Sequence, residues 1–138
     1  MRYLARREYS RAELHARLLT YATPDDNVEA VLDELVKRGW QSDERAATQL
    51  VHAKRSRFGT QRIAHELRQR GIADELIGAA LPELKETELE AAREVWKKKF
   101  GVAPQDEKEK AKQMRFMRSR GFGLDVVFKV LRGESEIE

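Results

Sequence analysis

The sequence contains no cysteine, so neither disulfide bonds nor a cysteine-ligated metal site can hold the fold together. It has only three prolines, and β-branched residues nowhere alternate with polar ones over a long stretch, which disfavours strands. No apolar run approaches the roughly 18 residues that a membrane-spanning helix needs, and the N-terminus lacks the apolar core of a signal peptide. We therefore expect an all-α protein that resides in the cytoplasm and does not enter a membrane.

Charged residues, in contrast, are abundant. They make up 37% of the chain against 41% hydrophobic residues, a balance that favours thin, highly exposed helical units over one thick globule. The formal net charge is only +3 and the isoelectric point is near 9.3. Because this basic bias is mild, the position of the charges matters more than their sum.

A pattern of residues recurs along the chain about every 50 residues. Residues 67–72 read Leu-Arg-Gln-Arg-Gly-Ile, and residues 117–122 read Met-Arg-Ser-Arg-Gly-Phe. The apolar positions that follow correspond as well: Ile77, Ala80 and Leu81 match Val127, Val130 and Leu131, and Ile77, Leu81 and Leu84 match Val28, Leu32 and Leu35. Because helix, glycine turn and second helix recur together, the sequence predicts a tandem repeat.

We expect three units of three short helices each, arranged as an elongated array that can curve. The units span residues 1–39, 40–84 and 85–133, and an acidic tail follows at 134–138. The first unit is expected to lack the start of its first helix, of which residues 2–7 form the tail. Short three-helix units are marginal alone, so neighbouring units must bury one another's apolar faces.

Local signals predict the helix ends in the first unit. Ser10 and Glu13 form a capping-box pattern, and residues 23–26, Thr-Pro-Asp-Asp, predict the start of the next helix, which Gly39 ends. The expected buried stripe of that helix comprises Val28, Val31, Leu32 and Leu35.

In the second unit, Ser42 predicts a helix start, and Gly59 and Gly71 predict the ends of the first and second helices. Pro82 predicts the end of the third. The expected inward face of the first helix comprises Ala46, Ala47, Leu50, Val51 and the aliphatic stem of Lys54. In the third unit we expect helices at about 106–119 and 124–131, after a loop at 101–105 that carries about five extra residues.

The aromatic residues are interpreted as structural. Tyr9 and Phe58 occupy equivalent places in the repeat, just before the second helix, and are expected to plug the cores. Trp40 and Trp96 are expected to make contacts between repeats.

Basic residues gather in three groups, whereas the closing helices carry acids. The candidate partner-binding residues are Lys54, Arg55, Arg57, Arg62, Arg68, Arg70, Lys97, Lys98, Lys99, Lys112, Arg115, Arg118 and Arg120. Lys and Arg near helix C-termini can simply complement the helix dipole, which is natural for the Arg-x-Arg-Gly turns. For the groups as a whole we favour a surface that faces a polyanion or an acidic protein. Few aromatics lie among them, so a base-stacking platform is not indicated.

The sequence shows no catalytic or metal-binding pattern. His15, His52 and His65 form no pair at helical spacing and no triad with acids, and there is no phosphate-binding glycine loop or serine elbow. We therefore expect a protein that is not an enzyme and needs no cofactor.

Five segments together resemble the bacterial RecX regulatory proteins. They are residues 6–14 (RREYSRAEL), 39–45 (GWQSDER), 58–63 (FGTQRI), 67–72 (LRQRGI) and 118–122 (RSRGF). The resemblance covers nearly the whole chain, and the motifs come in the family's order. The departures are the missing start of the first helix and Trp40, where the family tends to carry a tyrosine.

The resemblance implies a monomeric cytoplasmic modulator of the RecA recombinase, acting in homologous recombination, DNA repair and the SOS response. Proteins similar to this one bind RecA and its nucleoprotein filament on single-stranded DNA, lie in the filament groove, and lower ATP hydrolysis, strand exchange and co-protease activity. Capping and destabilisation of the filament are both compatible with this role. Weak contact with DNA phosphates is a further expectation.

Two alternatives stay open. In one, the second and third helices of a repeat act as a helix-turn-helix-like DNA-binding module. Against it, Arg118 and Arg120 precede the turn, and residues 76–84 are too acidic and apolar to read a groove. In the other, the chain is a structural scaffold without nucleic-acid contact, whose binding would not depend on salt.

Overall fold

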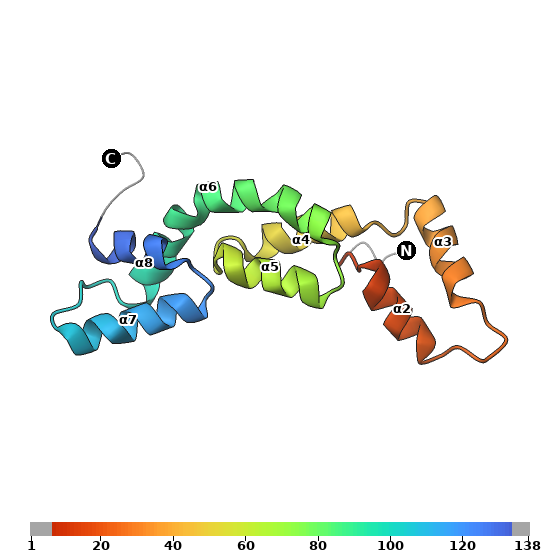
Figure 1. Cartoon of the computed structure of the whole chain (residues 1–138), viewed down its shortest axis with the longest axis horizontal. Helices are drawn as coiled ribbons and strands as arrows, with labels where there is room; N and C mark the ends of the chain where they lie inside the picture. Colours follow the sequence, from red (N-terminus) through yellow and green to blue (C-terminus); the bar gives the residue numbers. More distant parts are fainter. Residues whose placement is uncertain (1–6, 134–138) are drawn as a thin grey trace.

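Groups of packed helices that follow one another along one axis form the computed structural model, which describes residues 7–133 (Figure 1). In that range the elements are α2 (Arg11–Leu19), α3 (Val28–Lys37), α4 (Asp43–Lys54), α5 (Thr60–Gln69), α6 (Asp74–Lys99), α7 (Glu107–Ser119) and α8 (Leu124–Leu131), with no strand among them. The expected elongated, all-helical array is confirmed. The helix tail expected up to Arg7 and the acidic tail lie outside the described residues, apart from Arg7 itself.

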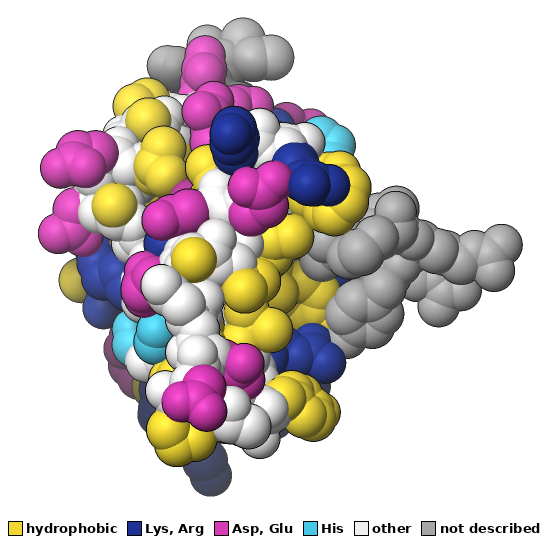
Figure 2. Space-filling model, turned by 90° about the vertical axis from the view of Figure 1, so that its right-hand side faces the viewer, with side chains coloured by type: hydrophobic (Ala, Val, Ile, Leu, Met, Phe, Trp, Pro, Cys, Tyr) yellow, Lys and Arg dark blue, Asp and Glu magenta, His cyan; other side chains and the backbone are white. Residues whose placement is uncertain are grey.

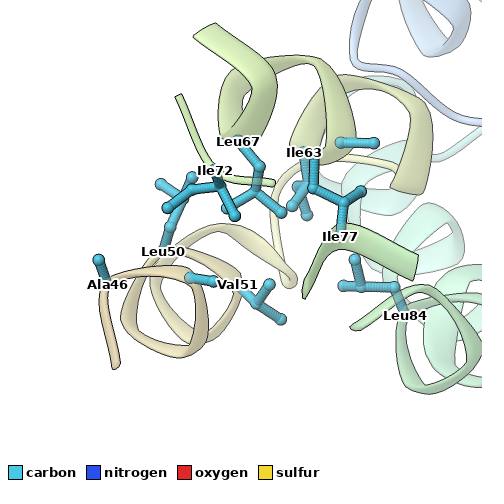
Figure 3. Close-up of a cluster of buried hydrophobic side chains, with 10 residues drawn as sticks. Ala46, Leu50, Val51, Ile63, Leu67, Ile72, Ile77 and Leu84 are labelled. Carbon is cyan, nitrogen blue, oxygen red and sulfur yellow. The ribbon is translucent and has the colours of Figure 1, made fainter. Parts of the chain in front are cut away.

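Two hydrophobic cores hold the second and third units. The second unit buries α4 side chains, among them Ala46, Ala47, Leu50 and Val51 as expected, against α5 and the first half of α6 (Figure 3). The third unit buries side chains from the second half of α6, from α7 and from α8, with Met117, Phe122 and Val127 fully enclosed.

The first unit is thinner, because its only described helices are α2 and α3, which pack on each other. Of these two helices, only Leu32 is buried. The expectation that Val31 belongs to a buried stripe is wrong, since its side chain is 48% exposed. A helix with one packing neighbour can bury only a narrow stripe of side chains.

α6 is shared between two units. It runs unbroken over 26 residues, with Leu84 in the second core and Leu89 in the third. The prediction that Pro82 ends a helix is therefore wrong. A proline deprives the carbonyl four residues earlier of its partner, here that of Gly78, and both residues are exposed, where water can replace the bond. The burial of apolar side chains on both sides of Pro82 then outweighs its local cost.

Most local helix signals act as expected. Ser10 and Glu13 form a complete capping box, the Ser42 side chain caps α4, and Gly39 and Gly71 adopt positive φ after α3 and α5. The predicted start of α3 at residues 23–26 is wrong, because Asn27 accepts the N-terminal hydrogen bond instead.

Three further expectations need correction or refinement. Gly59 does not end α4, which stops at Lys54; it precedes α5 instead. Trp40 is not buried between units: the residue is 47% exposed, and the Arg38 guanidinium lies 5.4 Å from its ring centroid. Trp96 packs within the third unit, where its indole N–H donates to Gln113.

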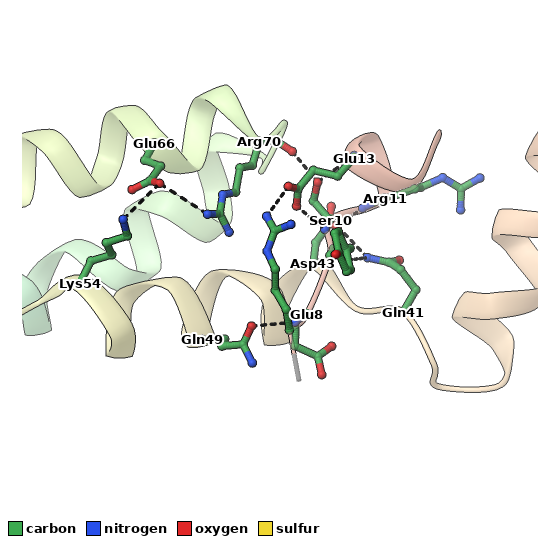
Figure 4. A network of polar contacts seen from close by, with 12 residues as sticks. Glu8, Ser10, Arg11, Glu13, Gln41, Asp43, Gln49, Lys54, Glu66 and Arg70 are labelled. Atoms are coloured by element: carbon green, nitrogen blue, oxygen red, sulfur yellow. Dashed lines mark hydrogen bonds and ion pairs between the residues drawn. The ribbon is translucent and has the colours of Figure 1, made fainter. Parts of the chain in front are cut away.

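The first and second units meet where α2 begins. The Ser10 hydroxyl donates to the backbone carbonyl of Arg70, and the backbone N–H of Arg11 donates to Asp43 Oδ1 at 2.8 Å (Figure 4). Gly71 lies so close to Ala12 that a β-carbon at this glycine would overlap the Ala12 methyl group. We call this contact the first junction.

The second junction repeats this arrangement between the second and third units. The backbone N–H of Gly59 donates to the Arg120 carbonyl at 2.8 Å, and that of Gln61 donates to the Gly121 carbonyl at 3.2 Å. The backbone N–H of Thr60 donates to Glu88 Oε1 at 2.8 Å. Because α5 has no side-chain cap of its own, the third unit supplies the partners for its first N–H groups.

The two junctions use equivalent residues of the repeat. Thr60 corresponds to Arg11, and Glu88, near the start of the third unit, corresponds to Asp43 near the start of the second. In both cases an acid of one unit caps the middle helix of the preceding unit. The sequence suggested the Arg-x-Arg-Gly turns only as sources of basic side chains. In the structure their backbone carbonyls contribute to the same contacts.

Candidate binding surface

Five cations surround two phenylalanine rings at the second junction, and we call this group the basic–aromatic cluster. It comprises Arg57, Arg62, Lys98, Lys99 and Arg120 around Phe58 and Phe116. The segment after α4, the start of α5, the end of α6 and the end of α7 each contribute to it. Only the stacking of the second and third units brings these residues together.

The Phe58 ring forms the first half of the cluster. The guanidinium carbon of Arg62 lies 4.3 Å from the ring centroid, that of Arg120 lies 5.1 Å away and that of Arg57 lies 5.6 Å away. The Lys54 ammonium lies 5.2 Å from the same centroid, but it also contacts Glu66 and is therefore not counted in the cluster. One side of Phe58 packs against the hydrophobic core of the second unit, which agrees with its expected role in plugging that core. Its remaining surface carries cations from two units.

The Phe116 ring forms the second half. Arg120 lies 5.2 Å from its centroid, so the same guanidinium touches both rings, and the Lys99 ammonium lies 5.2 Å from it. A pocket of about 270 Å³ opens beside them, lined by cluster residues together with Ser56, Glu94 and Val95. The cations thus follow one another across the junction, from Arg57 to Lys99.

The positive charge of the cluster has no matching acid in ion-pair contact. None of its five cations forms an ion pair with any residue between 7 and 133. Glu94, which lines the pocket, is the one acid among the residues around it. Four of the five side chains are exposed and Arg120 is half-buried. The surface is therefore open to an anionic partner.

Four other candidate residues are engaged by acids of the chain. Lys54 and Arg70 both contact Glu66, at 3.7 Å and 3.4 Å. Arg55 contacts Glu83 on α6 at 3.1 Å. Arg68 lies 3.9 Å from Asp74. These acids offset much of the positive charge that the sequence suggested along α4 and α5.

The remaining candidates, Lys97, Lys112, Arg115 and Arg118, are exposed and form no ion pair within the described range. Lys97 lies on α6 and the other three on α7, and none of them lies over the Phe58 or Phe116 ring. Phe116 was absent from the sequence-based candidates, although Phe116 and Arg120 stand four residues apart on α7, a spacing at which helical side chains meet.

The first unit presents a different surface, seen from its end in Figure 2, where hydrophobic and acidic side chains gather. Its exposed hydrophobic residues include Tyr21, Val31 and Val36. On α3, Glu29 and Asp33 accept hydrogen bonds from Arg11, and these bonds raise the pKa of Arg11 above its ordinary value. Between residues 7 and 39 seven acids stand against five Lys and Arg residues, so the first unit lacks the positive excess of the other two units.

No group of side chains within residues 7–133 could hold a metal ion. In that same stretch, no helix combines the length and the apolar character that crossing a bilayer requires.

The fold and its surface define a tandem helical-repeat protein that presents side chains from successive three-helix units along an extended face. Three family models match the chain, described as the first, second and third three-helix domains of RecX, at residues 1–35, 42–81 and 86–131. The chain belongs to the RecX family of regulatory proteins, which confirms the resemblance found in the sequence.

Relatives of known name agree with this assignment. The chain is 47% identical over 133 residues to the regulatory protein RecX of Chromobacterium violaceum, covering 96% of this chain and 86% of that one. It is 47% identical over 132 residues to that of Leptothrix cholodnii, covering 96% and 84%. The crystal structure of RecX from Lactobacillus salivarius superposes with a TM-score of 0.77 at 17% identity, over 96% of this chain and 89% of that one. This last likeness concerns the fold.

Proposed function

We propose that this chain is a non-catalytic regulator that binds the RecA recombinase and its filament on single-stranded DNA, and lowers ATP hydrolysis, strand exchange and co-protease activity. Membership of the RecX family supports the regulatory role. The observation that carries the binding hypothesis is the basic–aromatic cluster, whose cations have no acid partner among the described residues. We further propose that the protein acts as a cytoplasmic monomer and uses no cofactor.

The shape of the molecule supports binding along a filament. A thin array of helical units offers a long face for its volume, and the basic–aromatic cluster lies on it where the second and third units meet. A filament groove lined by acidic protein surface and nearby phosphates would attract such a face electrostatically.

A charge-reversal experiment tests the proposal. RecA's single-strand-dependent ATP hydrolysis is measured while the protein is titrated in, at low and at moderate salt. We expect the unmodified chain to inhibit at substoichiometric ratios, and the double variant Arg57→Glu, Arg62→Glu to lose inhibition with unchanged helicity. The control is Lys37→Glu, Lys85→Glu, which reverses two exposed cations outside the cluster.

Two outcomes would count against the proposal. If the unmodified chain does not inhibit RecA and binds duplex DNA tightly, the helix-turn-helix-like module becomes the better explanation. If the cluster variant still inhibits as well as the control does, the regulatory role stands but the proposed surface is wrong.

A further inference from the structure

We propose that the basic–aromatic cluster is a binding site for the phosphodiester backbone of a nucleic-acid strand, and that the bound strand clamps the second and third units together. This inference deepens the proposed function, and its choice of surface rests on it. It names the ligand of the cluster and adds a mechanical consequence of binding.

The site is composite, because neither unit alone contains it. Arg57, Phe58 and Arg62 belong to the second unit, whereas Lys99 and Arg120 belong to the third. The Phe58 ring accepts guanidinium groups from both units, with Arg62 at 4.3 Å and Arg120 at 5.1 Å from its centroid. A strand that touches this cluster must therefore touch two units at once.

Repulsion within the cluster favours an anion. Three guanidinium groups lie within 5.6 Å of one ring centroid and no acid forms an ion pair with any of them in the described part of the chain. Like charges gathered around one ring repel one another, although the ring and water reduce the effect. An anion bound beside these cations would offset the repulsion, so the cluster should favour negative groups.

The chemistry of the side chains favours phosphate. A guanidinium presents a planar fork of N–H donors that matches two phosphate oxygens, and three of the five cations are arginines. The pocket of about 270 Å³ beside Phe116 can accommodate a phosphate group, and Lys98 lies on its rim. Because cations cover Phe58 and Phe116 and both rings pack on the cores, neither ring offers an open face to a base. Binding should therefore be independent of base sequence.

The contacts below the cluster connect ligand binding to the junction. The Arg62 guanidinium donates to the Ser119 carbonyl at 3.1 Å, and the Gly59 N–H donates to the Arg120 carbonyl at 2.8 Å. Opening the junction would separate Arg120 from Phe58 and split the site. Because the strand binds only the closed arrangement in full, its binding energy must stabilise that arrangement.

The first test measures strand binding without RecA. The fluorescence anisotropy of a labelled oligothymidylate is followed at several salt concentrations for Arg57→Gln, Lys99→Gln and for the matched control Lys37→Gln, Lys85→Gln. Both double variants remove two exposed cations, and none of the four side chains donates a hydrogen bond at the junction. We expect the cluster variant to bind about tenfold more weakly, and the slope of log K against log[salt] to fall in magnitude by about 1.4. Equal affinities for the two variants would overturn the site.

The second test distinguishes phosphate from carboxylate and examines the clamp. A polyglutamate of equal charge should bind at least tenfold more weakly than the oligothymidylate, and equal binding would make the surface a docking site for acidic protein. With the oligothymidylate bound, the amide protons of Gly59 and Gln61 should exchange more slowly with solvent, and binding without this protection would overturn the clamp.

The outcome is separable from the proposed function, because RecA is absent from both tests. If strand binding behaves as expected and RecA is not inhibited, only the proposed function fails. If RecA inhibition depends on the cluster but binding of the oligothymidylate does not, the nucleic-acid site proposed here fails. The cluster would then contact protein.

Discussion

Replacing Glu88 with alanine tests the idea that each unit caps the helix of its predecessor. Glu88 lies in the part of α6 that belongs to the third unit, and its carboxylate accepts the backbone N–H of Thr60 at 2.8 Å. α5 has no side-chain cap of its own. The Thr60 hydroxyl is already buried without a hydrogen-bond partner in the described structure. The substitution therefore leaves a second polar group unsatisfied at the same place.

The expected loss follows from the type of contact. Removing a side-chain cap costs about 1 kcal/mol, and a hydrogen bond to a charged acceptor contributes about 1.5–3 kcal/mol when it is buried. Glu88 is half-buried, so we expect the free energy of unfolding to fall by about 1–2 kcal/mol. For a chain of this size that corresponds to a decrease in Tm on the order of 5 °C.

Urea unfolding followed by circular dichroism would measure the loss, and hydrogen exchange would locate it. The control is Glu86→Ala, which removes the same charge from an exposed position two residues earlier on α6. We expect the control to change stability little, and the Thr60 amide to exchange faster only in Glu88→Ala. Equal destabilisation by both variants, or an unchanged Thr60 amide, would refute the capping argument.

Glycine substitutions provide two further predictions. Gly59→Ala should lower the free energy of unfolding by about 3 kcal/mol. The φ of Gly59, −82°, is ordinary, but a β-carbon there would overlap backbone atoms of Gly121. Stability within about 1 kcal/mol of the unmodified chain would contradict this close approach. Gly39→Ala and Gly71→Ala distinguish backbone strain at positive φ from steric overlap with a neighbouring unit. Both glycines have positive φ, but nothing lies near a β-carbon at Gly39, whereas one at Gly71 would overlap Ala12. Thermal unfolding should show that the free energy of unfolding falls by about 1 kcal/mol in Gly39→Ala and by more in Gly71→Ala. The reverse order would show that the first junction does not need the close contact between Gly71 and Ala12.

Much of the fold could be predicted because its signals are local. Ser10 and Ser42 cap helices through atoms three residues away, and glycine turns end helices through their own backbone conformation. The helices at 107–119 and 124–131 were expected almost to the residue for the same reason. The repeat then implied that the pattern would recur as units.

The errors arise where tertiary packing overrides a local preference. Pro82 should end a helix, but Leu84 and Leu89 bury their side chains in two different cores and keep α6 continuous across it. Trp40 was expected to make a contact between repeats, but it stays exposed because its neighbour α3 has too few packing partners to cover it. In both cases the deciding contacts come from residues distant in the sequence.

The sequence by itself determined an all-helical tandem array, its repeat length, the resemblance to the RecX family and the groups of basic residues. Only the tertiary structure decided which of those cations remain available for a partner. Glu66 and Glu83 engage Lys54, Arg70 and Arg55, while the stacking of two units leaves the cluster around Phe58 without an acid in ion-pair contact. The physical reason is that electrostatic interaction depends on distance in space, and the sequence records distance only along the chain.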